Sequence, residues 1–375
     1  MVVIFLISFV LLIIYIGKIS SIYTSWDEVR EWRPTTYDLE DTGLSIIIPM
    51  RNEVQNIKAC LASILHAADR SQLNKIEVLC IDDQSEDTSF EIAQGIKDPR
   101  LIVVRSKTQG KKGAIQTAID LASYDHILCT DADCIVHQDW IRQTLSFLLK
   151  SKAQMITGLV AISPTERFID KWQYLDVMGM MAVTAFGIQR DSFRIGNGAN
   201  MAFRKSAFLD LNAYSENTHL ASGDDVFLIQ AAYRKWPDQV RFFKSQGGMV
   251  YTKGEASWNT LWEQRKRWAT KTRSYQEKGV IHLQGFIWFY HIIILVSLLS
   301  YPFFGGISFF TGLLMLFVKF CMDYLLLSKL ADYFDNRDPL KWYIPIGIIH
   351  FFYLIYAGLM ALIPQKYQWK NRRVS

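Results

Sequence analysis

A polar region of about 260 residues lies between two strongly apolar ends, and this distribution limits the folds open to the chain. Residues 2–16 carry no charged side chain, 285–327 is almost continuously apolar, and 343–363 is apolar again. A helix that crosses a bilayer needs about 20 apolar residues. We therefore expect an N-terminal anchor over residues 1–18, about three C-terminal spans within 284–364, and a globular domain between them. A signal peptide is the alternative for the first segment, but no basic n-region or clear cleavage site is present.

Charge and cysteine usage narrow the class of protein. The net charge is +5, which on charge alone would allow nucleic acid binding. The basic residues, however, cluster beside apolar segments, at 264–273 and in a basic tail over 365–375, so we expect a lipid bilayer as partner and no nucleic acid. The five cysteines are scattered without a C-x-x-C pair, which argues against a zinc site or a disulfide framework. Cys80 and Cys129 lie in strand-like runs and are expected as buried thiols of a reduced, cytosol-facing domain.

The first half of the polar region alternates short apolar runs with segments of helical periodicity. The runs are rich in Ile and Val, as buried strands are, and cover 44–49, 76–81, 101–104 and 126–130. Helical periodicity marks 56–68 and 85–95 between them. This alternation predicts an α/β domain over residues 40–255 with a parallel sheet covered on both faces. In such sheets the ligand lies beyond the carboxyl ends of the strands.

Carboxylates follow these predicted strands. Asp131 and Asp133 come directly after the strand 126–130, and two carboxylates at i and i+2 can reach one Mg²⁺ ion beside substrate phosphates. Asp82 and Asp83 end another strand and can bind a base or a ribose, although they can equally cap a helix. An Asp-x-Asp sequence also occurs by chance in loops, so each motif is weak by itself.

Further polar motifs follow along the chain. The segment 109–114 offers Lys111, Lys112 and glycines that suit a phosphate, or a solvated loop. Asp224 and Asp225 precede an apolar run, where a partly desolvated carboxylate can act as a general base or simply cap a helix. Residues 256–283 predict an amphipathic helix, with tryptophans opposite Lys and Arg, that lies on a membrane surface or packs on the globular domain.

The C-terminal apolar block raises a question of topology. Three C-terminal spans would place the basic tail on the side opposite a cytosolic domain, against the positive-inside tendency. One apolar segment could therefore be re-entrant or lie in the interface. Lys319 and Asp323 lie one helical turn apart within this block, and we expect them to form an ion pair.

In their order and spacing the motifs resemble those of the membrane-bound family 2 glycosyltransferases, the branch related to cellulose, chitin and hyaluronan synthases. The resemblance covers about 44–268 and implies a GT-A fold, a Rossmann-like mixed sheet, flanked by transmembrane helices. It implies a nucleotide-sugar donor, with a UDP-sugar favoured, and Mg²⁺ or Mn²⁺ as cofactor. One departure is Gln84, which stands where the family's nucleobase loop usually has Gly.

The resemblance also implies roles for individual residues. It assigns nucleotide binding to Pro49, Asn52, Glu53, Asp82, Asp83, Lys111 and Asp131, and metal binding to Asp131 and Asp133. It makes Asp225, beside Asp224, the base that deprotonates the acceptor hydroxyl. Gln264, Arg267 and Trp268 match the Q-x-x-R-W motif that borders diphosphate and acceptor, and Asn200 lies in a stretch that resembles the acceptor pocket lining.

The expected function is inverting transfer of a sugar to a lipid-linked or glycan acceptor at a bacterial cytoplasmic membrane, with the catalytic domain in the cytoplasm. About four apolar segments are few for a polymer channel, which favours addition of one or a few sugars. A processive polysaccharide synthase that forms its channel with a partner or as an oligomer is one alternative. A nucleotidyltransferase and a non-catalytic membrane scaffold are the others.

Overall fold

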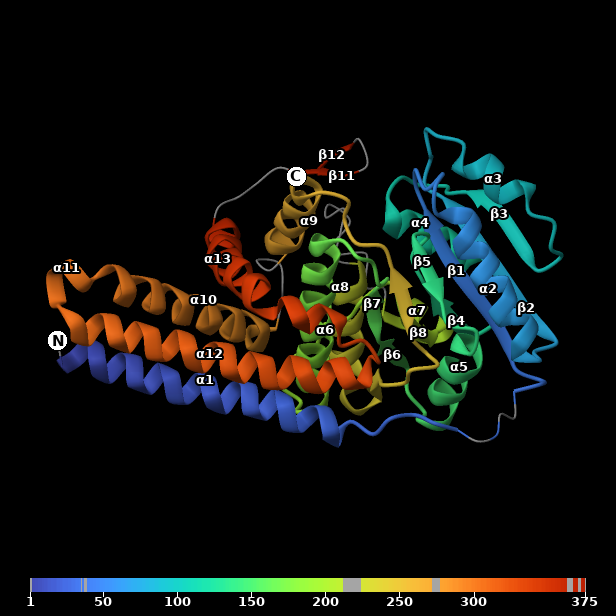
Figure 1. Ribbon diagram of the computed structural model, residues 1–375. Coiled ribbons are helices and arrows are strands. Elements are labelled where there is room, and N and C mark those ends of the chain that lie inside the picture. Colours follow the sequence, from blue (N-terminus) through green and yellow to red (C-terminus); the bar gives the residue numbers. More distant parts are fainter. Residues whose placement is uncertain are drawn as a thin grey trace. The chain divides into compact units, whose positions relative to one another are not determined.

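The computed structural model describes residues 2–34, 36, 39–211, 224–271, 277–362, 367–369 and 372–374 (Figure 1). The chain divides into two compact units. The helical unit comprises Met1–Glu28, Pro164–Phe193 and Glu255–Gln365, and the sheet unit comprises Val29–Ser163, Arg194–Gly254 and Lys366–Ser375. The predicted domain 40–255 is therefore interrupted, because 164–193 packs with the apolar helices rather than with the sheet.

The sheet unit is built on a seven-stranded mixed sheet in the order β3-β2-β1-β4-β8-β6-β9. The strands are β1 (Gly43–Met50), β2 (Lys75–Asp82), β3 (Leu101–Arg105), β4 (His126–Cys129), β6 (Met155–Gly158), β8 (Met201–Arg204) and β9 (Val240–Phe243). Strand β8 runs antiparallel to β4 and β6, and the other pairs are parallel. In β1 and β2 every residue after the first is buried, so both faces of the sheet are covered there.

A second, three-stranded sheet in the order β5-β10-β7 adjoins the first within the sheet unit. Its strands are β5 (Cys134–Val136), β7 (Val160–Ile162) and β10 (Val250–Thr252). The helices of the unit are α2 (Ile57–Ser71), α3 (Ser89–Gly95), α4 (Lys111–Leu121), α5 (Trp140–Lys150), α7 (Lys205–Leu211), α8 (Asp224–Lys235) and η1 (Pro237–Gln239). The C-terminal strands β11 (Tyr367–Trp369) and β12 (Arg372–Val374) form a hairpin that belongs to this unit.

The four predicted strands and the mixed α/β sheet are confirmed. The predicted helix 85–95 starts later, at Ser89, because side chains hold the preceding residues in a turn: Asp82 accepts from the Ser85 N–H, and Asn52 Oδ1 accepts from the Glu86 N–H at 2.8 Å. The short strands from β5 to β10 carry no periodicity long enough to predict them. Cys80 and Cys129 are free and buried, as expected.

The helical unit contains four helices long and apolar enough to cross a membrane among the residues that the structure describes. They are α1 (Val2–Glu28), α10 (Lys278–Leu299), α12 (Gly306–Tyr333) and α13 (Tyr343–Leu362), the last preceded by η3 (Asp338–Trp342). The unit also holds α6 (Phe168–Gln189), α9 (Trp258–Lys271) and the single turn α11 (Tyr301–Phe304). The helix predicted within 256–283 is thus α9, with 272–276 outside the described residues.

The predicted ion pair inside the apolar block is present. Lys319 Nζ lies 2.7 Å from Asp323 Oδ2, and the Tyr15 hydroxyl of α1 donates to the other carboxylate oxygen. Lys319 is only 2% exposed, so this pair fixes α1 against α12 at one depth. Of the predicted basic tail over 365–375, the structure describes 367–369 and 372–374, the strands β11 and β12.

Candidate active site

The loops that follow β1, β2, β3 and β4 meet at one edge of the large sheet. These strands are adjacent and parallel, so their carboxyl ends lie together. The four loops supply Asn52 and Glu53, Asp83, Lys111, and the Asp131–Asp133 turn respectively. The sequence motifs that lie far apart along the chain are therefore brought to one place.

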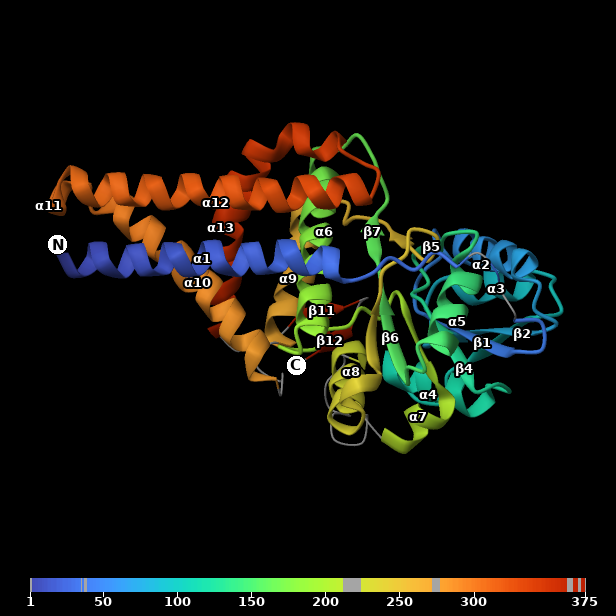
Figure 2. The ribbon, with the colours of Figure 1, turned by 90° about the horizontal axis from the view of Figure 1, so that it is seen from below.

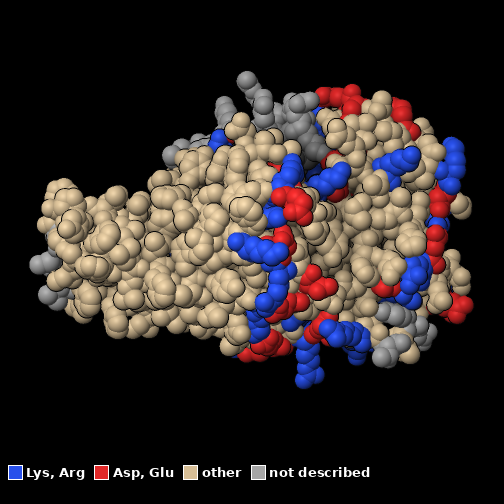
Figure 3. Space-filling view, in the orientation of Figure 1, with Lys and Arg blue, Asp and Glu red and all other residues tan. Residues whose placement is uncertain are grey.

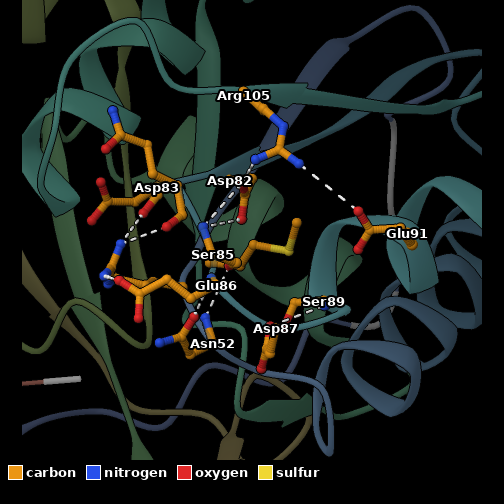
Figure 4. A network of polar contacts seen from close by, with 12 residues as sticks. Asn52, Asp82, Asp83, Ser85, Glu86, Asp87, Ser89, Glu91 and Arg105 are labelled. Atoms are coloured by element: carbon orange, nitrogen blue, oxygen red, sulfur yellow. Dashed lines mark hydrogen bonds and ion pairs between the residues drawn. The ribbon is translucent and has the colours of Figure 1, made fainter. Parts of the chain in front are cut away.

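Arg51 organises the loop after β2, and the sequence analysis did not single it out. Its guanidinium is buried and donates to the carbonyl oxygens of Asp83 (2.7 Å) and Gln84 (2.6 Å), and it also binds the Glu86 carboxylate (2.8 Å). Figure 4 shows this network around the labelled residues Asp83, Ser85 and Glu86. The planar, multi-donor guanidinium suits such convergent acceptors.

Two residues in this network have left-handed backbone. Asn52 has φ 50° and Gln84 has φ 54°. A side chain in this region is strained unless the surroundings hold it, and Asn tolerates it better than most residues. At Gln84 the Arg51 guanidinium supplies that support through the Gln84 carbonyl oxygen. The departure from Gly at this position therefore leaves the loop conformation intact.

Asp82 and Asp83 have different partners although they are adjacent. The fully buried Asp82 carboxylate accepts from the Ser85 N–H at 3.2 Å and faces Arg105 at 3.4 Å (Figure 4). Asp83 Oδ1 accepts from the Gly110 N–H at 2.7 Å. Gly110 has φ 97°, which favours glycine, and directly precedes α4. Asp83 thereby ties the β2 loop to the start of the helix that begins with Lys111.

The Asp131–Asp133 turn is held between the two sheets. It leaves β4 of the large sheet and enters β5 of the small sheet, and the Cys134 N–H closes it by donating to the Asp131 carbonyl oxygen at 3.1 Å. The intervening Ala132 is buried, whereas Asp131 and Asp133 are partly exposed. The i and i+2 carboxylates therefore point away from the core, as a ligand-binding role requires.

Lys111 faces this turn. Its ammonium lies 2.6 Å from Asp131 Oδ1, with the two side chains 20% and 33% exposed. The thiols of Cys60 and Cys134 lie next to this turn and are buried. Burial is the main reason that the pKa of each thiol is raised well above its usual value; Asp131 and Asp133 raise both further, and Cys80 adds to the effect at Cys60. The thiols are fully buried, whereas the carboxylate oxygens of this turn are partly exposed and open to a ligand.

No group of three or more His, Cys, Asp and Glu side chains that could hold a metal ion occurs within the described parts of the chain. The two carboxylates of the turn fit a hard cation such as Mg²⁺ or Mn²⁺ that takes one or two protein oxygens and fills its other positions with phosphate and water. The residues present thus suit a metal that arrives with a diphosphate.

Asp225 joins the same edge through a short series of contacts. Strand β8 begins where β4 ends, because the two pair antiparallel from Met201 opposite Cys129. The Thr130 hydroxyl donates to the Ala199 carbonyl oxygen (2.8 Å), and the Gly198 N–H donates to Asp225 Oδ2 (3.1 Å). Asp225 Oδ1 also accepts from the Val226 N–H (2.8 Å) at the first turn of α8. The backbone of Asp224 is helical, but its side chain lies outside the described parts.

Asn200 has a structural place instead of an exposed one. Its side chain is buried, donates to the carbonyl oxygens of Leu159 and Gly248, and accepts from the Trp140 indole N–H. A Cβ on Gly158 would lie 2.5 Å from its amide nitrogen. The amide of Asn200 is thus bound to other groups of the protein, so the predicted contact of Asn200 with an acceptor is not supported.

The remaining two nucleotide-loop residues differ in exposure. Pro49 is buried in β1 beside Ile81 of β2, so it shapes the strand end rather than offering a polar contact. Glu53 is partly exposed, and its carboxylate accepts from the Asn56 amide at 2.8 Å. Asn56 in turn accepts from Lys253 at 2.7 Å, which connects the β1 loop to the segment after β10.

The Q-x-x-R-W motif lies on α9 in the helical unit. The Gln264 amide donates to Glu255 at 2.9 Å, while Arg267 and Trp268 are partly exposed. The tryptophan face of α9 packs within this unit: Trp258 contacts Trp172 of α6, and Trp262 contacts Tyr353 of α13. Of the two predicted environments for this helix, packing against protein is thus present on that face.

Arg265, inside the same motif, is the buried anchor of α9 and was missed from the sequence. Its guanidinium lies 2.6 Å from Asp176 of α6 and 4.1 Å from the centre of the Trp268 ring. Asp176 also contacts His350 of α13 at 3.2 Å. Burial alone would raise the pKa of Asp176. Arg265 and His350 lower this pKa by more than burial raises it, so the pKa of Asp176 lies below its usual value. The carboxylate is therefore ionised and joins three helices.

Comparison with known proteins gives consistent results. Residues 45–211 match the model of the family described as Glycosyl transferase family 2. The poly-beta-1,6-N-acetyl-D-glucosamine synthase of Staphylococcus aureus (strain COL) is 26% identical over 235 residues, which are 60% of this chain and 54% of the synthase. Glycosyltransferase AglE of Haloferax volcanii is 26% identical over 192 residues, 50% of this chain and 60% of AglE. The chain thus spans about half the length of the synthase it matches.

A solved structure confirms the fold. A mannosyltransferase from Pyrobaculum calidifontis, in complex with GDP-Man and Mn²⁺, superposes with a TM-score of 0.56 at 15% identity, covering 96% of this chain and 97% of that one. The expected GT-A architecture flanked by helices is therefore present. This likeness extends through the apolar helices as well as the sheet.

Proposed function

Because the chain belongs to glycosyltransferase family 2, we propose that it transfers a sugar, with inversion, from a nucleoside diphosphate sugar to a hydroxyl of a membrane-held acceptor. One observation carries this proposal: a continuous series of contacts at the sheet edge. It runs from Asp83 through Gly110 to Lys111 and Asp131, and from Thr130 through Ala199 and Gly198 to Asp225. Groups suited to a nucleoside, a diphosphate, a cation and a base thus lie in one row.

The donor occupies the β1–β4 end of this row in the proposal. Asp83 and Asp82, with Pro49, Asn52 and Glu53 around them, form the nucleoside side, and the Arg51 network keeps the loop in shape for the base. Lys111 and the first turn of α4 suit the diphosphate, since helix N-termini and ammonium groups both attract anions. We propose a UDP-sugar, with N-acetylglucosamine first among the sugars because the synthase relative is named for its polymer.

Asp131 and Asp133 would hold Mg²⁺ or Mn²⁺ together with the diphosphate, and the mannosyltransferase of the same fold was solved with Mn²⁺. When bound, the cation supplies positive charge that stabilises the departing nucleoside diphosphate. We propose Asp133 as the direct ligand of the cation, as the family resemblance implies, with Asp131 beside it and paired with Lys111.

Asp225 acts as general base in the proposed step. The acceptor O–H gives its proton to the Asp225 carboxylate while the oxygen attacks the anomeric carbon. The bond from that carbon to the phosphate oxygen breaks, and the electron pair leaves with the nucleoside diphosphate, whose charge Lys111 helps to stabilise. The N–H groups of Gly198 and Val226 fix the carboxylate before the acceptor arrives.

The acceptor side rests on Gln264, Arg267 and Trp268 of α9. Arg267 would contact the diphosphate, and Trp268 offers a ring face on which a sugar can stack. The Arg265 guanidinium on the Trp268 ring supports this assignment, because it fixes the orientation of the indole. The apolar helices of the same unit favour a lipid-linked or glycan acceptor at a membrane, and we propose the bacterial cytoplasmic membrane with the sheet unit in the cytoplasm.

A processive polysaccharide synthase is the second candidate, and the synthase relative favours it. The structure describes four helices that could cross a membrane, and a processive enzyme would form its channel from these together with a partner or as an oligomer. Product length from the purified chain separates the two: short products support the first proposal, and long polymer made by this chain alone supports the second.

The experiment that tests the proposal is a donor panel. The full chain in nanodiscs is given isotopically labelled UDP- and GDP-sugars with Mg²⁺, Mn²⁺ or a chelator, and a bacterial lipid extract as acceptor. We expect metal-dependent transfer of label from one UDP-sugar into the lipid or glycan fraction. Transfer from no donor, together with no binding of nucleotide or metal, would favour the scaffold alternative.

A further inference from the structure

The sheet unit buries Arg194, the first residue of this unit after α6. Many Lys and Arg side chains lie at the surface, as Figure 3 shows for one face of the molecule. Arg194 is only 2% exposed, and the other arginines buried in the described part of the chain, Arg51 and Arg265, each hold a motif in place. A buried guanidinium is costly unless neighbouring groups offset the loss of water. The contacts of Arg194 therefore indicate its role.

Arg194 holds the C-terminal half of α8. Its guanidinium carbon lies 3.4 Å from the centre of the Tyr233 ring, which places the charge on the aromatic face. Its carbonyl oxygen accepts from the side-chain amide of Gln230 at 3.3 Å, and Gln230 is itself buried. Tyr233 and Gln230 lie three residues apart, so they share one face of α8. Arg194 thus contacts this helix both through its charge and through its backbone.

The segment that begins with Arg194 follows α8 back to its first turn. Gly196 lies against the helix, because a Cβ there would be 3.3 Å from Ile229 Cδ1 and 3.6 Å from the Asp225 carbonyl oxygen. Two residues later, the Gly198 N–H donates to Asp225 Oδ2 at 3.1 Å. The segment and α8 therefore run side by side in opposite directions, and the proposed base lies at the end of this contact.

The segment 194–198 cannot lengthen much between its two attachments to α8. Four residues of chain, from 194 to 198, span at most about 14 Å. Eight residues of α-helix, from 233 back to 225, rise about 12 Å. The segment is therefore close to its full length. A shift of α8 at Tyr233 would move Asp225 relative to Gly198, since neither the helix nor the segment can absorb it.

The large sheet holds the other side of this contact. The Asn197 N–H donates to Thr157 Oγ1 of β6 at 3.2 Å, and the Thr130 hydroxyl after β4 donates to the Ala199 carbonyl oxygen at 2.8 Å. This stretch is therefore fixed on the sheet. Helix α8 contacts β9 at the edge of the sheet and lies away from β2 (Figure 2). The position of Asp225 thus depends on how α8 itself is held.

We propose that Arg194 is a positioning residue for the proposed base. By holding Tyr233 and Gln230, it sets the position of α8 along the segment 194–198. This brings the Asp225 carboxylate to the Gly198 N–H and to the hydroxyl of the acceptor. The inference rests on the proposed function, in which Asp225 takes the acceptor proton. Proton transfer requires a hydrogen-bond distance, and a displacement of about 1 Å can lower the rate by about 10²-fold.

Variants of Tyr233 test the contact. Tyr233→Leu removes the aromatic face beneath the guanidinium, whereas Tyr233→Phe keeps it, and this partly exposed position should tolerate both changes. In nanodiscs, with metal and the preferred donor, Tyr233→Leu should lower kcat by about 10–10²-fold, and Tyr233→Phe should stay near wild type. The dissociation constant of the nucleoside diphosphate, measured by calorimetry, should not change in either variant. Equal kcat in the Leu and Phe variants would overturn the proposal.

Arg194→Lys tests the other partner, because it keeps the charge but loses the planar group that stacks on the ring. We expect the same loss of kcat as in Tyr233→Leu, again with unchanged nucleotide affinity. Unchanged nucleotide affinity also shows that the variant has folded. Wild-type kcat in Arg194→Lys would show that the stacked guanidinium does not place the base.

Lys235 gives a matched control on the same helix. Its ammonium lies 5.3 Å from the centre of the Trp236 ring and pairs with Asp210 at 2.6 Å, at the exposed end of α8. Lys235→Met therefore removes a cation from an aromatic face of α8 and should leave kcat unchanged. A loss as large as in Tyr233→Leu would show that any change at this end of α8 lowers turnover, which would contradict a specific role for Arg194.

Combination with Asp225→Asn separates positioning from general damage. Residues that act through one group are not additive, so Tyr233→Leu should cause little further loss of the residual turnover of Asp225→Asn. If the two losses multiply, the effect of Tyr233 does not pass through Asp225 and the proposal fails.

Hydrogen exchange tests the placement without catalysis, and it separates this proposal from the proposed function. The peptide that contains the Gly198 N–H should exchange about tenfold faster in Tyr233→Leu than in wild type or Lys235→Met. Unchanged exchange would overturn the inference. Faster exchange, in a protein whose Asp225→Asn variant keeps full turnover, would support the placement of Asp225 and contradict its proposed function as the base.

Discussion

Asp225 stands at the first turn of α8, and two backbone N–H groups bind its carboxylate. An Asn in its place keeps the shape and one acceptor oxygen but cannot take a proton near neutral pH. We expect Asp225→Asn to lower turnover by about 10²–10⁴-fold while nucleotide affinity, measured by calorimetry, is unchanged. The exposed Asp238 of η1 gives a control, since Asp238→Asn should keep full turnover. Wild-type turnover in Asp225→Asn would remove Asp225 as the base.

Replacing Lys111 should have opposite effects on metal binding and on nucleotide binding. Without the ammonium, no positive charge offsets the Asp131 carboxylate, so Lys111→Met should bind Mn²⁺ more tightly in the absence of nucleotide. The same variant should bind the nucleoside diphosphate more weakly, by roughly tenfold for the loss of one charged contact. Paramagnetic resonance of Mn²⁺ and calorimetry of the nucleotide measure the two. Lys107→Met, at an exposed lysine paired with Asp120, should change neither affinity.

Gln84 tests the strained loop. Glycine removes the energetic cost of the left-handed conformation, but it also raises the conformational entropy of the unfolded chain. These effects oppose each other, so Gln84→Gly should change the free energy of unfolding by less than about 1 kcal/mol. A β-branched residue fits this backbone poorly, and Gln84→Val should cost about 1–3 kcal/mol and weaken nucleotide binding. Denaturant unfolding and calorimetry check both. Equal stability of the Val and Gly variants would show that the loop takes another conformation.

At the scale of elements, Asp176 joins α6, α9 and α13. Asp176→Asn leaves the buried Arg265 without its counter-charge, a change that typically costs about 3–5 kcal/mol. We expect a lower melting temperature. Because Arg265 orients Trp268, we also expect the KM for the acceptor to rise by a larger factor than the dissociation constant of the nucleotide. Asp176→Glu should recover part of both. The exposed pair Asp332–Arg337 is the control, where Asp332→Asn should cost at most about 1 kcal/mol.

The same carboxylate predicts a pH response. Because the pKa of Asp176 is lowered in the folded chain, its ion pair stabilises the fold at pH values above the ordinary Asp pKa of about 3.9. This contribution is lost as the pH falls through the lowered pKa. The melting temperatures of wild type and Asp176→Asn should therefore differ most near neutral pH and converge in strong acid.

Some elements could be predicted from the sequence and others could not, for physical reasons. The strands β1, β2 and β4 are buried on both faces and therefore appear as continuous Ile- and Val-rich runs. Strands β5 and β7 have only three residues each, too few for any period. Helix α6 is buried around most of its surface, so it lacks the polar stripe that marks an amphipathic helix.

Over the whole molecule, the residues predicted for the donor side lie together because each follows a parallel strand. The assignment of Asn200 came from the resemblance alone and is not supported, since burial and internal hydrogen bonds use its amide fully. Arg51 and Arg265 were missed although each lies between residues that the resemblance assigns, because only tertiary contacts distinguish them from other basic residues. The sequence pattern predicts which residues lie at the site, but it does not predict which buried residues position them.

The division into two units also has a consequence at this scale. The sheet unit holds the proposed donor site, and the helical unit holds α9 with the Q-x-x-R-W motif. Solubilisation that strips lipid from the apolar helices of the helical unit should therefore affect transfer more than nucleotide binding. Adding phosphatidylglycerol back to the detergent-purified chain should restore turnover while the nucleotide dissociation constant stays the same; a change only in nucleotide affinity would contradict this.

The stoichiometry of one turnover tests the central claim most directly. Label transferred to the acceptor and each phosphate product are counted in the same reaction with the full chain, its metal and its preferred donor. The proposed transfer predicts one nucleoside diphosphate for every sugar transferred, with both signals lost in Asp225→Asn. Release of pyrophosphate, or of nucleoside diphosphate without any sugar in the acceptor fraction, would contradict the account.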